Sequence, residues 1–363
     1  MALPGIVEAT RSYEAWLGAQ VPLIGKDLGY KHEQMRKHPF PFLRATFYRW
    51  AQRWPQDAGP FAGAPEIVAI GDLHVENFGL WRDREGRLVW GVNDFDEACR
   101  APYTNDLLRL AVSAMLAADE REIDLGEREA CEAVLDGYRG AIGGKLAPVV
   151  LAERQVWLRK LVAKRLRNPH HFWAKLLEAE EPDPAHVNAT AAILDAALPK
   201  HHQDPVYRHR QSGLGSLGRP RVAVVAQWCG GAVAREGKAV AASAWAWAGG
   251  RPGRSEPIHT TKILGEAVRS PDPFLTVDHG WTVRRLAADN SRLELGDMRD
   301  GDHARLLAAM GRETANVHGG LRATRETLSR HLAGLDAGLF RDTACRMRDA
   351  VVADRREWKR ASG

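Results

Sequence analysis

The chain has few cysteines, and those it has lie far apart. Among its 363 residues only Cys99, Cys131, Cys229 and Cys345 are cysteines, and no two of them form a C-x-x-C pair. A structural zinc site usually needs such paired thiolates, and a secreted disulfide scaffold needs a dense, even set. The sequence therefore argues against both, and a reducing cytoplasm fits it best.

Long uncharged apolar runs are missing as well. The first 25 residues contain Glu8, Arg11 and Glu14, so they lack the apolar core of a signal peptide. No stretch approaches the roughly 18 apolar residues of a membrane span. We expect a cytoplasmic protein without a membrane partner.

The overall composition is that of an ordinary globular protein. Hydrophobic residues make up 45% of the chain and charged residues 27%, which excludes a disordered or collagen-like protein. At roughly 150 residues per domain, the length suggests two domains with a cleft between them. The net charge of +5 favours anionic ligands such as nucleotides, but it is too small to indicate nucleic acid. The oligomeric state stays open.

Hydrophobic periodicity and turn residues predict a mixed order of helices and strands. Helices are expected over the first 60 residues and over 106–118, 127–142, 151–166, 260–269, 303–332 and 335–357. Strands are expected over 66–70, 78–81, 87–92, 221–228, 232–240 and 281–286. The segment 178–185 is expected to be an exposed loop, and Trp245 and Trp247 to lie on one face of a buried strand.

The first motif that could carry chemistry is the run of residues 70–78, Ile-Gly-Asp-Leu-His-Val-Glu-Asn-Phe. Asn77 follows Asp72 by five positions, which is the spacing of the kinase catalytic loop. There the Asp orients or deprotonates the attacking hydroxyl, and the Asn binds a magnesium ion. This interpretation makes Asp72, His74 and Asn77 the candidate catalytic residues.

A second polar group follows the predicted hairpin, at Asn93-Asp94-Phe95-Asp96-Glu97. It stands where a kinase carries its metal-binding Asp-Phe-Gly, and oxygen ligands of this kind suit Mg²⁺. Asn77 and Asp94 are the expected metal ligands, and Asp96 could hold a second ion. The competing interpretation is that these carboxylates are turn and cap residues. Asp106, at the start of a helix, is expected to be a cap or an organiser of the loop.

A glycine-rich segment, Gly213-x-Gly215-x-x-Gly218 with Ser216 inside it, precedes two predicted strands. A Rossmann site would need a helix after the glycines, and a Walker loop would need Lys and Ser or Thr where Arg219-Pro220 stands. Both are therefore disfavoured.

A lysine in the second of those strands could serve the glycine segment. Lys238 lies 20 positions after Gly218, where it could reach phosphates beneath a glycine loop. Such a lysine usually has an acidic partner on a nearby helix. Glu266 is the expected partner, with Glu256 as the second candidate.

Five runs, 71–79, 92–97, 215–218, 235–239 and 272–275, resemble the bacterial family of unknown function DUF2252, over about Pro39 to His318. That family is grouped with the protein-kinase-like superfamily, which includes aminoglycoside phosphotransferases. The resemblance implies a bilobal α+β fold that binds ATP and Mg²⁺.

The chain departs from the superfamily pattern in two ways. Ile70 stands where the antibiotic-modifying enzymes have histidine, and the glycine loop follows the catalytic loop instead of preceding it. A circular permutation would reconcile the order, since Met310–His318 resembles the helix that normally leads into the catalytic loop.

The expected architecture has a helical catalytic part over 1–204, a small glycine-loop sheet over 205–290, and helices over 291–363 that return to the first part. If it is correct, Lys238 and Asp94, 144 positions apart, line one cleft with their tips within about 10 Å. The helix over Met310–His318 should pack beside the Asp72 loop.

The hypothesis for function is Mg²⁺-dependent transfer of the γ-phosphoryl group of ATP to a hydroxyl of a small molecule or a protein. Transfer of AMP by the same fold is an alternative, as is a nucleotide-binding pseudokinase without turnover. A metallophosphoesterase would explain Gly71-Asp72-x-His74, but its expected upstream Asp-x-His is missing.

Overall fold

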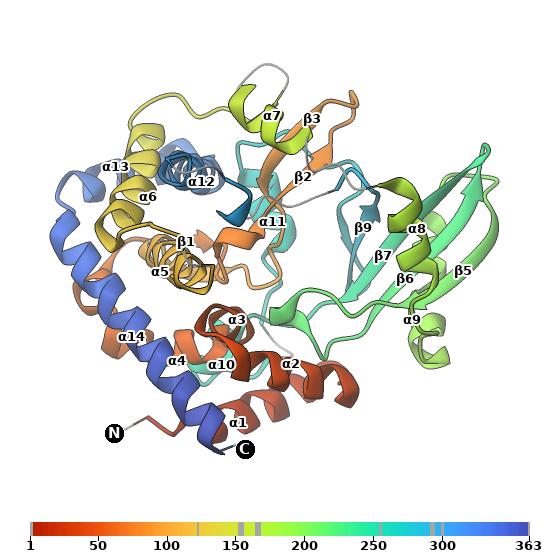
Figure 1. Ribbon diagram of the computed structural model, residues 1–363, viewed down its shortest axis with the longest axis horizontal. Coiled ribbons are helices and arrows are strands. Elements are labelled where there is room, and N and C mark those ends of the chain that lie inside the picture. Colours follow the sequence, from red (N-terminus) through yellow and green to blue (C-terminus); the bar gives the residue numbers. More distant parts are fainter. Residues whose placement is uncertain are drawn as a thin grey trace.

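The computed structural model describes residues 3–121, 123–151, 156–163, 168–253, 256–290, 295–298 and 301–361. Within these ranges the protein has an α+β fold in which helices gather on one side and a five-stranded sheet lies on the other (Figure 1). None of the described helices combines the length and the apolar character that crossing a membrane requires.

Most helices form what we call the helical part. Its helices are α1 (Ile6–Gly18), α2 (Gly25–Lys37), α3 (Pro39–Ala45), α4 (Phe47–Asp57), α5 (Thr104–Glu120), α6 (Glu127–Ile142), α10 (Ala244–Ala248), α11 (Thr260–Glu266), α12 (His303–His318), α13 (Arg322–Ala333) and α14 (Ala337–Ala361). Buried apolar side chains from most of these helices share one continuous core. The remaining helices are α7 (Val156–Ala163), α8 (Pro169–Leu177) and α9 (Pro184–Ala197).

Two short antiparallel strand pairs lie within the helical part. Strand β1 (Glu66–Ala69) pairs with β4 (Cys99–Pro102), and β2 (Phe78–Arg82) forms a hairpin with β3 (Leu88–Val92). The sequence prediction of this hairpin is confirmed. Its ends carry the two polar motifs, because Asp72 to Asn77 precede β2 and Asp94 follows β3.

The third sheet has the order β5-β6-β7-β9-β8 and is antiparallel throughout. Its strands are β5 (Gln203–His209), β6 (Arg221–Trp228), β7 (Gly231–Ala239), β8 (Thr276–Asp278) and β9 (Trp281–Leu286). With α8 and α9 it makes up what we call the sheet part. The predicted strands over 221–228 and 281–286 are confirmed.

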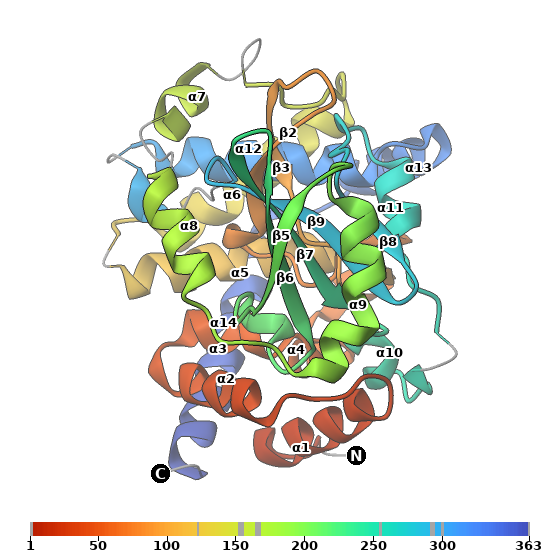
Figure 2. The same ribbon diagram turned by 90° about the vertical axis from the view of Figure 1, so that its right-hand side faces the viewer.

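The two faces of this sheet are covered by different helices, as Figure 2 shows with α8 on the left and α9 on the right. Val222 and Val224 of β6 pack against Leu194 of α9. Side chains alternate along a strand, so the neighbouring positions point to the opposite face, where Val225 packs against Phe172 of α8. Arg221, Glu236 and Lys238 share the α8 face by the same register.

Proline and asparagine or aspartate set several helix starts. Pro39 opens α3 and forces His38 into an extended conformation, which ends α2. Asn168 and Asp183 cap α8 and α9, each followed directly by a proline. The predicted loop over 178–185 therefore ends at Asp183.

Some element predictions were wrong. Trp245 and Trp247 belong to the short helix α10 and not to a strand, and they contact aromatic rings of α1 and α4. The single helix expected over 303–332 is two helices separated near Gly320. A Cβ there would lie 1.6 Å from the backbone oxygen of Glu266, so the chain needs glycine where it passes α11.

Candidate functional site

A buried carboxylate holds the backbone just before Asp72. Asp106, in the first turn of α5, accepts hydrogen bonds from the backbone N–H of Ile70 (2.7 Å) and of Gly71 (3.0 Å). Its Oδ2 also lies 2.8 Å from Nε2 of His318, the last residue of α12. Asp106 thus organises the loop, as expected, and the predicted packing of the Met310–His318 helix beside that loop is confirmed.

Gly71 allows a close crossing of two segments. Its φ is +86°, a conformation that disfavours side chains, and a Cβ would lie 2.2 Å from the backbone oxygen of Glu97. Glu97 is itself fixed, because it accepts hydrogen bonds from Arg219 (2.7 Å) and from the backbone N–H of Ala244 (2.7 Å). The loop before Asp72 is therefore locked onto the segment after Asp94.

One oxygen of Asp72 is bound by a buried arginine. Arg109, fully buried on α5, donates from Nε to Oδ1 of Asp72 at 2.8 Å and also donates to the backbone oxygen of Leu43. The guanidinium lies over the rings of Phe47 and Trp50. Burial raises the pKa of Asp72, and the charge of Arg109 opposes that rise. Arg109 therefore fixes Oδ1 and leaves Oδ2 as the oxygen available for chemistry.

His74 and Asn77 take their positions from the turn between Asp72 and β2. Nδ1 of His74 accepts the backbone N–H of Glu76 at 3.2 Å, and its ring meets Phe40 edge to face. The amide nitrogen of Asn77 donates to the backbone oxygen of Asp72. Because that nitrogen is engaged, the Asn77 side-chain oxygen is the atom left to act as a ligand.

The second polar group meets the sheet part through Lys238. Nζ of this lysine, on β7, lies 3.5 Å from Oδ1 of Asp94 and also forms an ion pair with Asp96. The distance is well inside the predicted 10 Å. Burial alone would raise the pKa of Asp94, but the positive charges of Lys238 and of Arg284 outweigh it and hold that pKa below its usual value. Asp94 is therefore charged at neutral pH.

The glycine loop, residues 213–218, lies directly over Asp72. Gly213 is left-handed, and residues 214–216 form a single 3-10 turn. A Cβ on Gly215 would lie 3.0 Å from Oδ2 of Asp72 and 3.0 Å from the backbone oxygen of Arg44. The loop is held by Arg221, which donates to Ser216 at 2.7 Å, and by the buried Lys31, whose Nζ is 3.3 Å from the Gly215 oxygen.

These elements enclose one small cavity of about 30 Å³. We call it the small cavity. The candidate residues that line it are Asp72, His74, Asn77, Asp94, Asp96, Gly213, Gly215 and Ser216, together with Arg44, Ile70, Leu214 and Glu97. Small-molecule pockets usually measure roughly 300–1,000 Å³, so a nucleotide could enter only if the glycine loop moved away. Gly218 does not line the cavity and instead packs close to Leu28.

Glu266 and Glu256 were both wrong as partners of Lys238. Glu266 lies 3.9 Å from Lys262 on the same helix, and Glu256 pairs with Arg251 at 2.9 Å. The acids that pair with Lys238 are Asp94 and Asp96, which follow a strand and not a helix. The buried carboxylate nearest to Lys238 in sequence, Glu236, is occupied by arginines: Arg210, Arg221 and Arg284.

Three residues that position the site were not among the candidates. Arg109 had a signal in the sequence, because it stands three positions after Asp106 in an otherwise apolar helix stripe. Arg219 stood out only as a departure from the Walker pattern. Lys31 gave no signal, since α2 carries several other charges. Burial lowers the pKa of Lys31 to about 8.

The donor set is compatible with a hard divalent cation. Asp94 supplies a charged carboxylate, Asn77 supplies an amide oxygen, and both line the small cavity. Among the described residues, no group of three or more His, Cys, Asp and Glu side chains is arranged to hold a metal ion. Protein side chains alone would therefore form an incomplete shell, as is usual for Mg²⁺, which keeps water and substrate oxygens as further ligands.

The bacterial family DUF2252, described as "Uncharacterized protein conserved in bacteria", matches residues 24–166. That segment contains both polar motifs and ends before the glycine loop and Lys238. No curated protein and no solved structure matches the chain.

Proposed function

We propose that the protein is an ATP- and Mg²⁺-dependent phosphotransferase of kinase-like, circularly permuted fold that acts on a hydroxyl group. The observation that carries this proposal is the meeting of Lys238 and Asp94 at 3.5 Å, beneath a glycine loop and beside Asp72. A structural role alone gives no reason for Asp72, Asp94 and Asp96 to line one cavity while a buried lysine behind it pairs with two of them. Phosphoryl transfer needs this combination of charges.

Asp72 is the group that orients or deprotonates the attacking hydroxyl. Its Oδ1 is bound by Arg109, and Oδ2 faces the glycine loop, so the reactive oxygen has a fixed direction. The hydroxyl oxygen forms a bond to the γ-phosphorus, the bond from that phosphorus to the bridging oxygen of ADP breaks, and Asp72 takes the hydroxyl proton. Burial favours the proton on Asp72 once it has arrived.

Asn77 and Asp94 are the residues that would hold Mg²⁺, with Asp96 beside them. The ion, when bound, neutralises the charge that develops on the transferring phosphate. Lys238 now neutralises Asp94 and Asp96. A cation held by the aspartates would leave the ammonium group of Lys238 free to bind phosphate oxygens.

The glycine loop supplies the lid over the phosphates. Gly215 has no side chain between the loop and Asp72, and Ser216 places a hydroxyl in the cavity wall. Two bonds tie the loop to the helical part, from Lys31 to the Gly215 oxygen and from the backbone N–H of Ile24 to the Gly218 oxygen, so opening it breaks fewer contacts than displacing Asp106 would. Loop movement therefore admits the nucleotide.

The test measures binding and turnover separately in two variants. Asp94→Asn removes a carboxylate that faces a divalent ion, and we expect Mg·ATP to bind at least about tenfold more weakly. Asp72→Asn should lower kcat by on the order of 10²-fold while ATP affinity changes little. The exposed Asp119→Asn on α5 is the control for a lost charge.

The readouts are calorimetric titration with Mg·ATP, with and without EDTA, and mass spectrometry of a metabolite pool and of protein acceptors. A gain of about 80 Da identifies phosphoryl transfer, whereas about 329 Da identifies AMP transfer. ATP binding without any modified product would indicate a pseudokinase. Nucleotide affinity unchanged in Asp94→Asn and unaffected by EDTA would remove the metal site from the proposal.

A further inference from the structure

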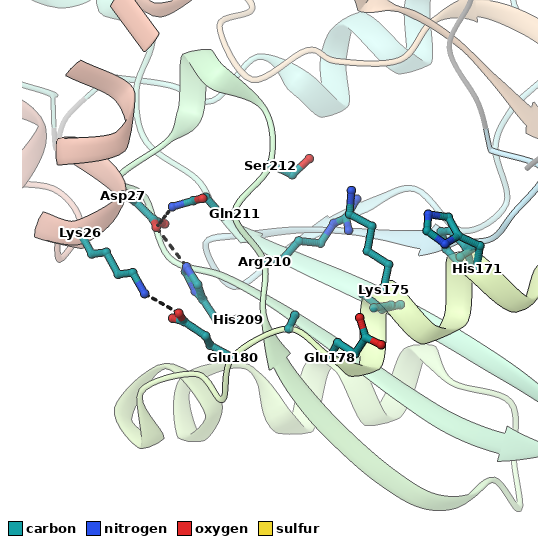
Figure 3. A pocket seen from close by; sticks show the side chains of 13 residues that line it. Lys26, Asp27, His171, Lys175, Glu178, Glu180, His209, Arg210, Gln211 and Ser212 are labelled. Carbon is teal, nitrogen blue, oxygen red and sulfur yellow. Dashed lines mark hydrogen bonds and ion pairs between the residues drawn. The ribbon is translucent and has the colours of Figure 1, made fainter. Parts of the chain in front are cut away.

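A second, much larger cavity lies beside the glycine loop. It measures about 790 Å³, within the size range of small-molecule pockets. We call it the large cavity. Its walls come from α2 of the helical part, from α8, from the connection between α8 and α9, and from residues 209–212, which lead into the glycine loop (Figure 3). Ser212 lines the large cavity, and the next residue, Gly213, lines the small one.

Several charged side chains around the large cavity are paired with other residues of its wall. Asp27 of α2 is buried and accepts a hydrogen bond from Gln211 (3.0 Å), and it lies 3.1 Å from His209. Lys26 pairs with Glu180 on the α8–α9 connection. These contacts join the helical part to the sheet part and hold the wall together, but their charges largely cancel.

A surplus of positive charge remains at the other end of the cavity. Arg210 lines the cavity and reaches Glu236, and the same carboxylate is also bound by Arg221 and Arg284. Three arginines thus share one acid. The side chain of Arg210 keeps an exposed fraction of 25%, so a ligand in the cavity can still reach it.

Lys175 adds a fourth cation at this end. In Figure 3 its side chain extends from α8 towards the guanidinium of Arg210. Lys175 is exposed, and no hydrogen bond or ion pair links it to another residue in the described ranges. Arg210 is paired with Glu236, and Glu178 also lines the cavity, but the cations at this end (Arg210, Arg221, Arg284 and Lys175) outnumber these two acids, so the surplus charge attracts an anion.

We propose that the large cavity binds a small polar molecule through a phosphate or carboxylate group held between Lys175 and Arg210. The apolar side chains of Phe172 and Leu176, which also line the cavity, would contact the remainder of that molecule. The anion could belong to a second substrate or to a nucleotide, and the chemistry is the same for both. This inference needs no phosphoryl transfer and goes beyond the proposed function.

The test is calorimetric titration at low ionic strength, in EDTA, with glycerol 3-phosphate, citrate and ATP as separate probes. We expect the wild-type protein to bind at least one of them, and Lys175→Glu to weaken that binding by about tenfold or more. Lys175→Arg should retain binding. Lys200→Glu, which makes the same charge change outside the cavity, is the matched control.

Each outcome decides the proposal. Loss of glycerol 3-phosphate or citrate binding in Lys175→Glu supports a site for a second substrate, and loss confined to ATP supports a site for the nucleotide. No binding of any probe by the wild type up to about 10 mM would overturn the proposal. So would equal losses in Lys175→Glu and Lys200→Glu. Because EDTA is present, failure of the Mg²⁺ site would not change these readings.

Discussion

The two walls of the small cavity are held in different ways. The wall that carries Asp72 rests on fully buried groups, with Asp106 bound to two backbone N–H groups and to His318. The opposite wall, the glycine loop, is held by three bonds to neutral acceptors: Arg221 to Ser216, Lys31 to the Gly215 oxygen, and the backbone N–H of Ile24 to the Gly218 oxygen. One wall is therefore built to stay fixed, and the other is built to move.

This difference suits a site that must be both accurate and accessible. Catalytic groups need a position fixed to a fraction of an ångström, which buried hydrogen bonds provide. Ligands need an entrance, which a loop with few contacts provides. The structure divides these tasks between segments that are more than 100 positions apart in the chain.

The largest expected effect is on the free energy of unfolding, which should fall much more when the fixed wall is mutated than when the glycine loop is mutated. Asp106→Ala leaves the N–H groups of Ile70 and Gly71 and the ring of His318 without their acceptor in a dry interior. We expect it to lower the free energy of unfolding by about 3–5 kcal/mol. Ser216→Ala, in the glycine loop, should cost only about 1 kcal/mol, because its partner Arg221 keeps Glu236.

Urea denaturation followed by tryptophan fluorescence measures both changes. Asp119→Ala on the exposed side of α5 controls for the loss of an aspartate from that helix. Equal costs for Asp106→Ala and Ser216→Ala would show that the two walls are equally rigid, and the division between a fixed and a moving wall would then be abandoned.

Local sequence predicted the fixed wall better than the rest of the site. The spacing of Asp72 and Asn77 and the hairpin after them are short-range features, and turn residues mark them clearly. The meeting of Lys238 with Asp94 was predicted because phosphoryl transfer requires the lysine that binds the phosphates and the aspartate that holds their metal ion to share one site. Periodicity alone would not bring together residues 144 positions apart.

The errors came from long-range packing. Glu266 was selected because kinases hold their lysine with a helical acid, yet two aspartates after a strand take that place here. Trp245 and Trp247 alternate as in a strand, but they lie in a short helix, where Trp247 meets Tyr13 of α1 edge to face and Trp245 stacks on Phe47 of α4. The neighbouring residues in the sequence do not predict which group will pair with a buried charge. They also do not predict which surface a pair of aromatic side chains will contact.

The second expected effect is a pH dependence of the free energy of unfolding. It comes from a residue that lies behind the fixed wall. Glu313 of α12 is buried against the hairpin, where its Oε2 accepts the Asn316 amide at 2.8 Å. Burial raises the pKa of Glu313 to about 7, despite the opposing charge of Arg269. A carboxyl with a raised folded-state pKa stabilises the fold at low pH, and that contribution is lost as the pH rises from about 4.5 to about 7.

The Glu313→Gln variant keeps the shape of the side chain and removes the carboxyl group that titrates. Between pH 5 and pH 8 the unfolding free energy of the wild type should fall by about 2–3 kcal/mol more than that of the variant, since each pKa unit corresponds to about 1.4 kcal/mol. All other groups titrate alike in both proteins, so the difference isolates Glu313. Parallel pH profiles would show that the fixed wall holds no such protonated acid.

The smallest expected effect tests the moving wall at its closest approach to Asp72. A methyl group on Gly215 would lie 3.0 Å from Oδ2 of Asp72 and 3.0 Å from the backbone oxygen of Arg44, so the loop must shift by a few tenths of an ångström. Because few bonds hold the loop, we expect Gly215→Ala to change stability by less than about 1 kcal/mol.

We expect a larger relative change in turnover than in stability. The shift of the loop also disturbs Oδ2 of Asp72, the oxygen that faces the substrate. We expect kcat to fall by a few-fold in Gly215→Ala, with no change in Gly231→Ala, because a Cβ on Gly231, at the start of β7, would meet nothing within 4 Å. Steady-state kinetics and denaturation on the same preparations separate the two quantities. If Gly215→Ala instead unfolded at a markedly lower urea concentration with its kcat intact, the loop would be part of the fixed structure, because a moving wall absorbs a methyl group while an immobile one is strained by it.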